Sequence, residues 1–106
     1  MIGYRIIVPA ELRTSLAHLH PGMKVKVRAS LRLLEQDPLV GKPLERELSG
    51  YRSYPIPPYR IVYRIEPSGL VVRLVWIGHR RDIYEILVHK LNAGEVRERR
   101  AIYIRK

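Results

Sequence analysis

The strongest constraint on the fold is a change in hydrophobic period partway along the chain. Before residue 37, apolar residues recur at intervals of four, four and three, which places them on one helical face: Met23, Val27, Leu31 and Leu34. From residue 60 to residue 65 the period is two, as in a strand: one face holds Arg60, Val62 and Arg64, and the other holds Ile61, Tyr63 and Ile65. Because a helical block precedes a strand block, the sequence predicts an α+β fold.

The first third of the chain predicts a short strand followed by two helices. Residues 4–8 form an apolar run, and residues 10–18 form a helix after Pro9, which suits a helix start. Pro21 suits the first turn of a second helix, and Pro38 predicts where that helix ends. We therefore expect an N-terminal strand and an αα-hairpin.

The middle of the chain predicts an antiparallel sheet after a loop at residues 39–47. Residues 51–54 form a short strand, and three prolines follow, which predicts an edge, a bulge or a turn because proline donates no ladder hydrogen bond. Residues 67–69, Pro-Ser-Gly, predict a hairpin turn. Residues 70–77 are almost continuously apolar and predict a central strand, covered on both faces, that ends at Gly78.

The end of the chain predicts a helix and a separable tail. Residues 81–91 carry an apolar stripe at helical spacing, and Asn92 and Gly94 favour a helix end. We expect one domain over residues 1–94, with helices packed on one side of the antiparallel sheet. Residues 95–106 hold five basic and two acidic residues, and we expect either an extra edge strand or a basic arm.

The charge of the chain indicates a polyanionic partner. Twenty Lys and Arg residues against ten Asp and Glu residues give a net charge of +10, which favours nucleic acid. Between Gly50 and Arg81 there are six Arg, no Lys and one acid, Glu66. Arginine holds phosphate at two points, so this stretch indicates phosphate recognition more than solubility alone. An acidic protein partner is the alternative.

Composition also narrows the location and the chemistry. The chain has no cysteine, which excludes disulfides, thiolate zinc sites and a thiol nucleophile. No apolar run is long enough to span a membrane, and the N-terminus lacks the pattern of a signal peptide. We expect a cytoplasmic protein that has no membrane partner, no bound metal and no cofactor.

Two sequence blocks carry a family resemblance. The blocks are Leu48-x-Gly50-Tyr51-Arg52 with Tyr59-Arg60-Ile61-Val62-Tyr63, and Gly78-His79-Arg80-Arg81-Asp82-Ile83-Tyr84 after the apolar strand. Together they resemble the RelE/ParE toxin superfamily of toxin–antitoxin systems. The resemblance implies a RelE-like fold, a cognate antitoxin as partner, and one of two activities. RelE-like members cut messenger RNA on the ribosome, whereas ParE-like members inhibit DNA gyrase; a module that binds RNA or protein without catalysis is a third alternative.

The chemistry of RNA cleavage suits these residue types. RNA carries its own nucleophile, the 2′-hydroxyl, so cleavage needs a base, a positive charge at the phosphate and an acid for the leaving oxygen. The resemblance assigns the catalytic role to Arg60, Arg80 and Tyr84, and His79 suits proton transfer near neutral pH. This chemistry needs no metal ion, and the resemblance implies a ribosome-dependent endoribonuclease, with DNA gyrase as the alternative target.

A second group of residues is expected to contact RNA. Arg52, Arg64 and Arg81 are candidates for phosphate binding, and Tyr54 for stacking on a base. RelE-like toxins carry two basic residues at the alternating positions where this chain has Arg52 and Tyr54, so the second charge is missing. The alternatives are a structural or antitoxin-facing role for Arg52 and Tyr54, and an ion pair with Glu85 for Arg81.

Overall fold

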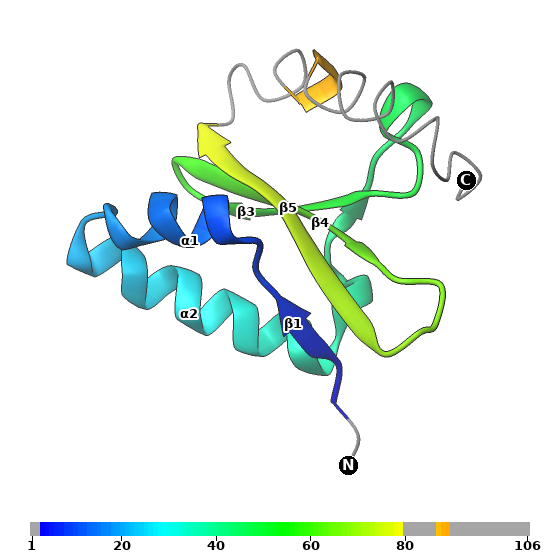
Figure 1. Ribbon diagram of the computed structural model, residues 1–106, viewed down its shortest axis with the longest axis horizontal. Coiled ribbons are helices and arrows are strands. Elements are labelled where there is room, and N and C mark those ends of the chain that lie inside the picture. Colours follow the sequence, from blue (N-terminus) through cyan, green and yellow to red (C-terminus); the bar gives the residue numbers. More distant parts are fainter. Residues whose placement is uncertain (1–2, 80–86, 90–106) are drawn as a thin grey trace.

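The described part of the chain forms one sheet with two helices on one face. The computed structural model describes residues 3–79 and 87–89 (Figure 1). The elements run in this order: β1 (Arg5–Ile7), α1 (Ala10–Ala17), α2 (Pro21–Gln36), the 3-10 turn η1 (Pro38–Val40), β2 (Lys42–Pro43), the 3-10 turn η2 (Arg46–Leu48), β3 (Arg52–Ile56), β4 (Tyr59–Ile65) and β5 (Val71–His79). No helix in these two ranges is long and apolar enough to cross a bilayer.

The sheet is mixed rather than purely antiparallel. Its five strands lie in the order β1-β5-β4-β3-β2, and the pairs among β2, β3, β4 and β5 are antiparallel. The antiparallel pairing of β3, β4 and β5 is as predicted. The N-terminal strand β1 joins the edge at β5 in parallel. A parallel neighbour needs a long crossover connection, and the helical hairpin that follows β1 begins such a connection across one face. The sequence prediction of an antiparallel sheet is therefore corrected at this edge.

The αα-hairpin forms as the sequence predicts. Pro21 occupies the first turn of α2, and the side chain of His20 accepts a hydrogen bond from the Gly22 amide at 3.1 Å, which caps the helix. Helix α2 ends at Gln36, before Pro38. The predicted apolar stripe faces the sheet: Val27 and Leu34 are buried, and Met23 and Leu31 pack against the same cluster.

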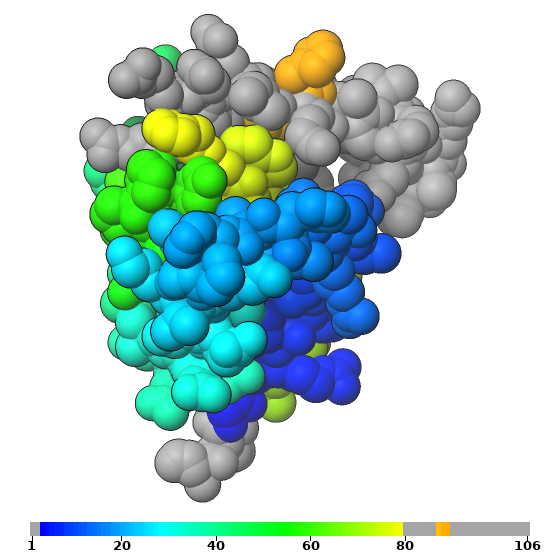
Figure 2. All heavy atoms as spheres, turned by 90° about the vertical axis from the view of Figure 1, so that its left-hand side faces the viewer, coloured from blue at the N-terminus to red at the C-terminus, as the bar shows by residue number. Residues whose placement is uncertain are grey.

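Two apolar clusters cover the two faces of the sheet. On the face of α1 and α2, buried side chains from the helices meet those of the strands: Leu12, Val27, Leu34, Ile56, Ile61, Tyr63, Val72 and Leu74. The opposite face holds a smaller cluster of Leu48, Val62 and Leu87. Figure 2 shows the hairpin spread over the first face, with the end of β5 above it. Strand β5 is thus an interior strand between β1 and β4, as predicted, although β4 holds the centre of the sheet.

Two predicted loop features differ in the structure. The segment predicted as a loop at residues 39–47 contains the short strand β2, which pairs with β3. Strand β5 does not end at Gly78 but continues to His79. Glycine is needed there for another reason, because a Cβ atom at Gly78 would collide with the indole ring of Trp76. The predicted turn at residues 67–69 is confirmed, with Gly69 at φ 92°.

Much of the C-terminal prediction lies outside the described residues. Residues 87–89 are helical, within the helix predicted for residues 81–91. Leu87 packs with Leu48 and Val62 on the face opposite to α1 and α2, so the prediction that all helices lie on one side of the sheet is wrong. The remainder of that helix, the domain boundary at residue 94 and the tail at residues 95–106 fall in ranges that the structure does not describe. These stay predictions.

Candidate phosphate-binding site

Arg60 lies at the start of β4, on the sheet face opposite to the helices. Its sequence neighbour Ile61 is buried against the helices, so alternation directs Arg60 to the other face. Its Nη1 atom donates a hydrogen bond of 2.8 Å to Oγ of Ser53 on β3. On the other side Arg60 pairs with Gly78 of β5, which has no side chain. Among the described residues, no carboxylate forms an ion pair with Arg60.

His79 is the last residue of β5 and lies at the same end of the sheet as Arg60. It pairs with Tyr59 in the sheet, and the two rings meet edge to face, with centroids 6.0 Å apart. His79 is exposed. Tyr59 directly precedes Arg60, and His79 directly follows Gly78, with which Arg60 pairs. Because side chains alternate along a strand, those of Tyr59 and His79 leave the sheet on the face opposite to that of Arg60. Arg60 and His79 therefore flank one end of the sheet from its two sides.

Arg52 and Tyr54 lie on the helix-covered face, not on the face of Arg60. Tyr54 packs against the cluster beneath the helices. Arg52, two residues earlier on β3, donates from Nη1 to the carbonyl oxygens of Gly41 at 2.6 Å and Leu39 at 3.3 Å. These bonds hold the segment between η1 and β2. The structure thus gives Arg52 a structural contact and does not bring it together with Arg60.

Arg64 lies at the far end of β4 from Arg60, beside an acidic residue. Its Nη2 atom is 3.4 Å from Oε1 of Glu66, and Arg73 on β5 places Nε 2.5 Å from Oε2 of the same carboxylate. The hydrogen bond from Arg73, supported by the charge of Arg64, holds the pKa of Glu66 below its ordinary value although burial acts in the opposite direction. The charge of Arg64 is therefore partly compensated.

Three of the predicted site residues lie outside the described residues: Arg80, Arg81 and Tyr84. Arg80 follows His79 directly in the sequence, at the end of β5. Within residues 3–79 and 87–89, no group of three or more His, Asp or Glu side chains is placed to hold a metal ion.

The sequence did not point to two buried polar residues near the site. Ser53 is 4% exposed and accepts the hydrogen bond from Arg60. Tyr63 is fully buried on the other face; its hydroxyl donates to the Pro38 carbonyl at 2.5 Å and accepts from the Gly41 amide at 3.0 Å. Burial raises the pKa of Tyr63, so the hydroxyl keeps its proton. A Cβ atom at Gly41 would collide with this hydroxyl.

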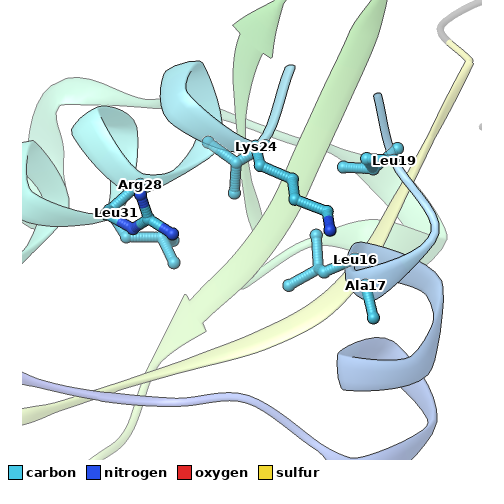
Figure 3. Close-up of a pocket in the computed structure, with 7 residues that line it drawn as sticks. Leu16, Ala17, Leu19, Lys24, Arg28 and Leu31 are labelled. Atoms are coloured by element: carbon cyan, nitrogen blue, oxygen red, sulfur yellow. The ribbon is translucent and has the colours of Figure 1, made fainter. Parts of the chain in front are cut away.

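A groove lies between α1 and α2, on the side of the molecule away from Arg60. Its lining is mainly apolar, with two cationic side chains from α2: Leu16, Ala17, Leu19, Val27, Leu31, Lys24 and Arg28. Figure 3 shows the Lys24 side chain extended toward Leu16 and Ala17 of α1. Neither Lys24 nor Arg28 forms an ion pair with another described residue. The groove therefore combines an apolar floor with positive charge.

A comparison with protein families identifies the group to which the chain is related. The family described as "ParE toxin of type II toxin-antitoxin system, parDE" matches residues 11–84, which spans both helices and strands β2 to β5. The chain belongs to this toxin family. The match ends at Tyr84, so both sequence blocks that resemble the RelE/ParE superfamily lie within it. The superfamily suggested by these blocks is confirmed.

Relatives of this ParE-family chain include proteins with RelE-type names. Toxin RelG of Mycobacterium tuberculosis is 46% identical over 52 residues, which cover 48% of this chain and 60% of that protein. The match therefore spans less than two thirds of the length of that relative. The structure of the toxin–antitoxin complex RelBE2, also from M. tuberculosis, matches at 34% identity with a TM-score of 0.66, over 77% of this chain and 97% of that chain.

A more distant structure supports the fold alone. A mutant of the Escherichia coli toxin RelE, in the free state, is 15% identical and has a TM-score of 0.68, over 85% of this chain and 99% of that chain. The α+β RelE-like fold predicted from the sequence is confirmed.

Proposed function

We propose that this ParE-family chain is a cytoplasmic toxin that cuts messenger RNA on the ribosome without a metal ion. The observation that supports this most is the state of Arg60: a half-buried arginine, held by a neutral hydroxyl and without a carboxylate partner among the described residues. An arginine in this state keeps its positive charge and most of its five N–H donors for an anion. A phosphodiester is the anion that the overall charge of +10 favours.

The proposed reaction is an internal transesterification. The ribose 2′-hydroxyl gives its proton to a base as its oxygen attacks the phosphorus, the bond from phosphorus to the 5′-oxygen breaks, and the 5′-oxygen takes a proton from an acid. The products are a 2′,3′-cyclic phosphate and a 5′-hydroxyl. Arg60, with Arg80, stabilises the negative charge that grows on the phosphate oxygens. Tyr84 is the proposed group for proton transfer and also suits stacking on a base. The side chain of His79 leaves the sheet on the face opposite to Arg60, so we do not assign it to the phosphate that Arg60 binds.

The structure changes the proposed roles of two arginines. Arg52 faces the helices and donates to backbone carbonyls, so we assign it to the fold and not to the phosphate. Arg64 shares Glu66 with Arg73, so its charge is less available than that of Arg60. The proposed phosphate site is therefore Arg60, at one end of the sheet, together with Arg80, which directly follows β5 in the sequence.

The ParE family description supports a second candidate, inhibition of DNA gyrase. Both candidates use exposed positive charge, and a shared fold does not choose between them. Induced expression in a bacterium with mapping of transcript ends separates them. Cut transcripts with 5′-hydroxyl ends support the ribonuclease. An SOS response with gyrase trapped on DNA and intact transcripts would replace it with the gyrase activity.

We also propose a cognate antitoxin as partner, docked through an acidic amphipathic helix in the groove between α1 and α2. The apolar floor suits the apolar side of such a helix, and Lys24 and Arg28 suit its carboxylates. The measurement is the association rate with the antitoxin encoded beside this chain. K24E/R28E should slow association, whereas K26E, an exposed charge of the same helix outside the groove lining, should change it little. Equal rates for the two variants would exclude the groove.

A further inference from the structure

The Ser53 hydroxyl is buried in the sheet where strands pair on both sides of it. On β3, Ser53 pairs with Lys42 of β2 on one side and with Val62 of β4 on the other. Its side chain lies on the face of Arg60, and the residue is only 4% exposed. Because strands on both sides hold the backbone of Ser53, its hydroxyl oxygen is an acceptor in a fixed place.

The bond between Ser53 and Arg60 fixes direction without removing charge. Serine is neutral, so its oxygen accepts from Nη1 of Arg60 at 2.8 Å and leaves the positive charge uncompensated. A guanidinium has five N–H donors in a planar fork, so one bond to Ser53 sets the orientation and the other donors stay available. A carboxylate at the same place would also orient the arginine but would neutralise it.

The strands on either side reinforce this arrangement. Arg60 pairs with Pro55 on β3 and with Gly78 on β5. Gly78 presents no side chain toward Arg60, and the space that its Cβ would take is filled by the Trp76 ring. Strand β2, which pairs with Ser53 through Lys42, is held in turn by the bonds of the adjacent Gly41 to Tyr63 and Arg52. The position of Ser53 is therefore determined by contacts on both faces of the sheet.

We propose that Ser53 is a positioning residue for the phosphate site: its buried hydroxyl holds the guanidinium of Arg60 in the orientation that binds the scissile phosphate. This inference rests on the proposed ribonuclease function. Ser53 itself does not touch RNA in this account. Because an arginine free to rotate spends less time in the orientation that binds the phosphate, S53A should lower both RNA affinity and the rate of the chemical step, with the larger loss in the rate.

The test is single-turnover cleavage of messenger RNA on programmed ribosomes, with S53A, S53T, R60A and S53A/R60A. S53A should lower the rate at saturating ribosomes by about tenfold, and S53T, which keeps a hydroxyl, should restore most of it. The double variant should cut no more slowly than R60A, because the hydroxyl acts only through Arg60. S68A, a change in the exposed turn between β4 and β5, is the control and should cut at the wild-type rate.

Three results would overturn the inference: wild-type cutting by S53A, no recovery in S53T, or a double variant that loses the full product of the two single effects. If the wild-type protein does not cut, the proposed function fails, and affinity for a 2′-O-methyl RNA measured over the same four variants decides the inference. Coupling between Ser53 and Arg60 in that affinity would support it, and independence would overturn it. Should S53A not fold, side-chain NMR of the wild-type protein decides, since free rotation of the Arg60 guanidinium would contradict the account.

Discussion

The two ends of β4 carry an arginine on the same face of the sheet, yet the two arginines have opposite kinds of partner. Arg60 donates to a neutral serine hydroxyl, whereas Arg64 shares the carboxylate of Glu66 with Arg73. One partner orients a cation and preserves its charge; the other orients a cation and offsets its charge. An arginine-rich segment is thus not one uniform basic surface, and the partner of each arginine decides what it can bind.

The largest difference in cleavage rate should appear between two variants, each of which removes one of the two β4 arginines. R60A should lower the single-turnover cleavage rate by on the order of 10²-fold, as removal of a group that stabilises transition-state charge does. R64A should lower it only a few-fold, because the Arg64 charge is already offset by Glu66. The rates of the two variants on programmed ribosomes check this, and similar losses for both would remove the distinction between the ends.

A second substitution gives Arg60 a carboxylate partner, which is the kind of partner that Arg64 has. S53D places a carboxylate beside Arg60, so the guanidinium should stay oriented but lose free charge. We expect cleavage to fall by about tenfold or more, equivalent to about 1.4 kcal/mol of transition-state free energy. Thermal unfolding should be recorded alongside, so that a variant that fails to fold is recognised. A folded S53D that cuts at the wild-type rate would show that the charge of Arg60 is not used.

The Tyr63 hydroxyl should matter for stability and not for chemistry. Y63F leaves the Gly41 amide and the Pro38 carbonyl without their partner in a buried site, which should cost about 1–3 kcal/mol of unfolding free energy. Denaturant unfolding measures this, with Y54F as a control, since no hydrogen bond of the Tyr54 hydroxyl is present in the described structure. An equal cost for both variants would contradict the assigned role of Tyr63.

The smallest effect should come from the acidic partner at the Arg64 end. E66Q should lower the free energy of unfolding by less than about 1 kcal/mol, because the side chain of Arg73 is 43% exposed and surface ion pairs contribute little. The folded-state pKa of Glu66 is lowered, so its contribution is present above the unfolded pKa and is lost as pH falls through the folded pKa. The stability difference between wild type and E66Q should therefore shrink below about pH 4.3. A difference that grows toward acid would reverse the sign of the interaction.

The sequence predicted the elements whose physical signal is local. The 4-4-3 spacing of α2, the proline at its start and the glycine turn between β4 and β5 each act over a few residues, and all three are confirmed. The parallel pairing of β1 with β5 joins residues such as Arg5 and Val71 that lie far apart in the sequence. No local pattern specifies such a contact, and the sequence prediction missed it.

In the candidate site too, local sequence patterns identified a residue but not its contacts across the sheet. The family blocks pointed to Arg60, but the partner of Arg60 depends on the register across the turn between β3 and β4. A two-residue turn at Pro57 and Pro58 pairs Pro55 with Arg60, which places Ser53 diagonally beside it. The face of the sheet on which the Arg52 side chain lies depends likewise on how β3 pairs with β4. Alternation was visible in the sequence, but which face the helices cover was not.

The most direct test of the Arg60 site measures RNA affinity without cleavage. Binding of a single-stranded 2′-O-methyl RNA is recorded over a range of salt concentrations for wild type, R60A and R64A. Each phosphate contact contributes about 0.7 to the slope of log affinity against log salt for single strands. The account predicts that R60A lowers the slope by about that amount and that R64A leaves it nearly unchanged. An unchanged slope in R60A, or the larger loss in R64A, would contradict the claim that the charge of Arg60 is the one kept for phosphate.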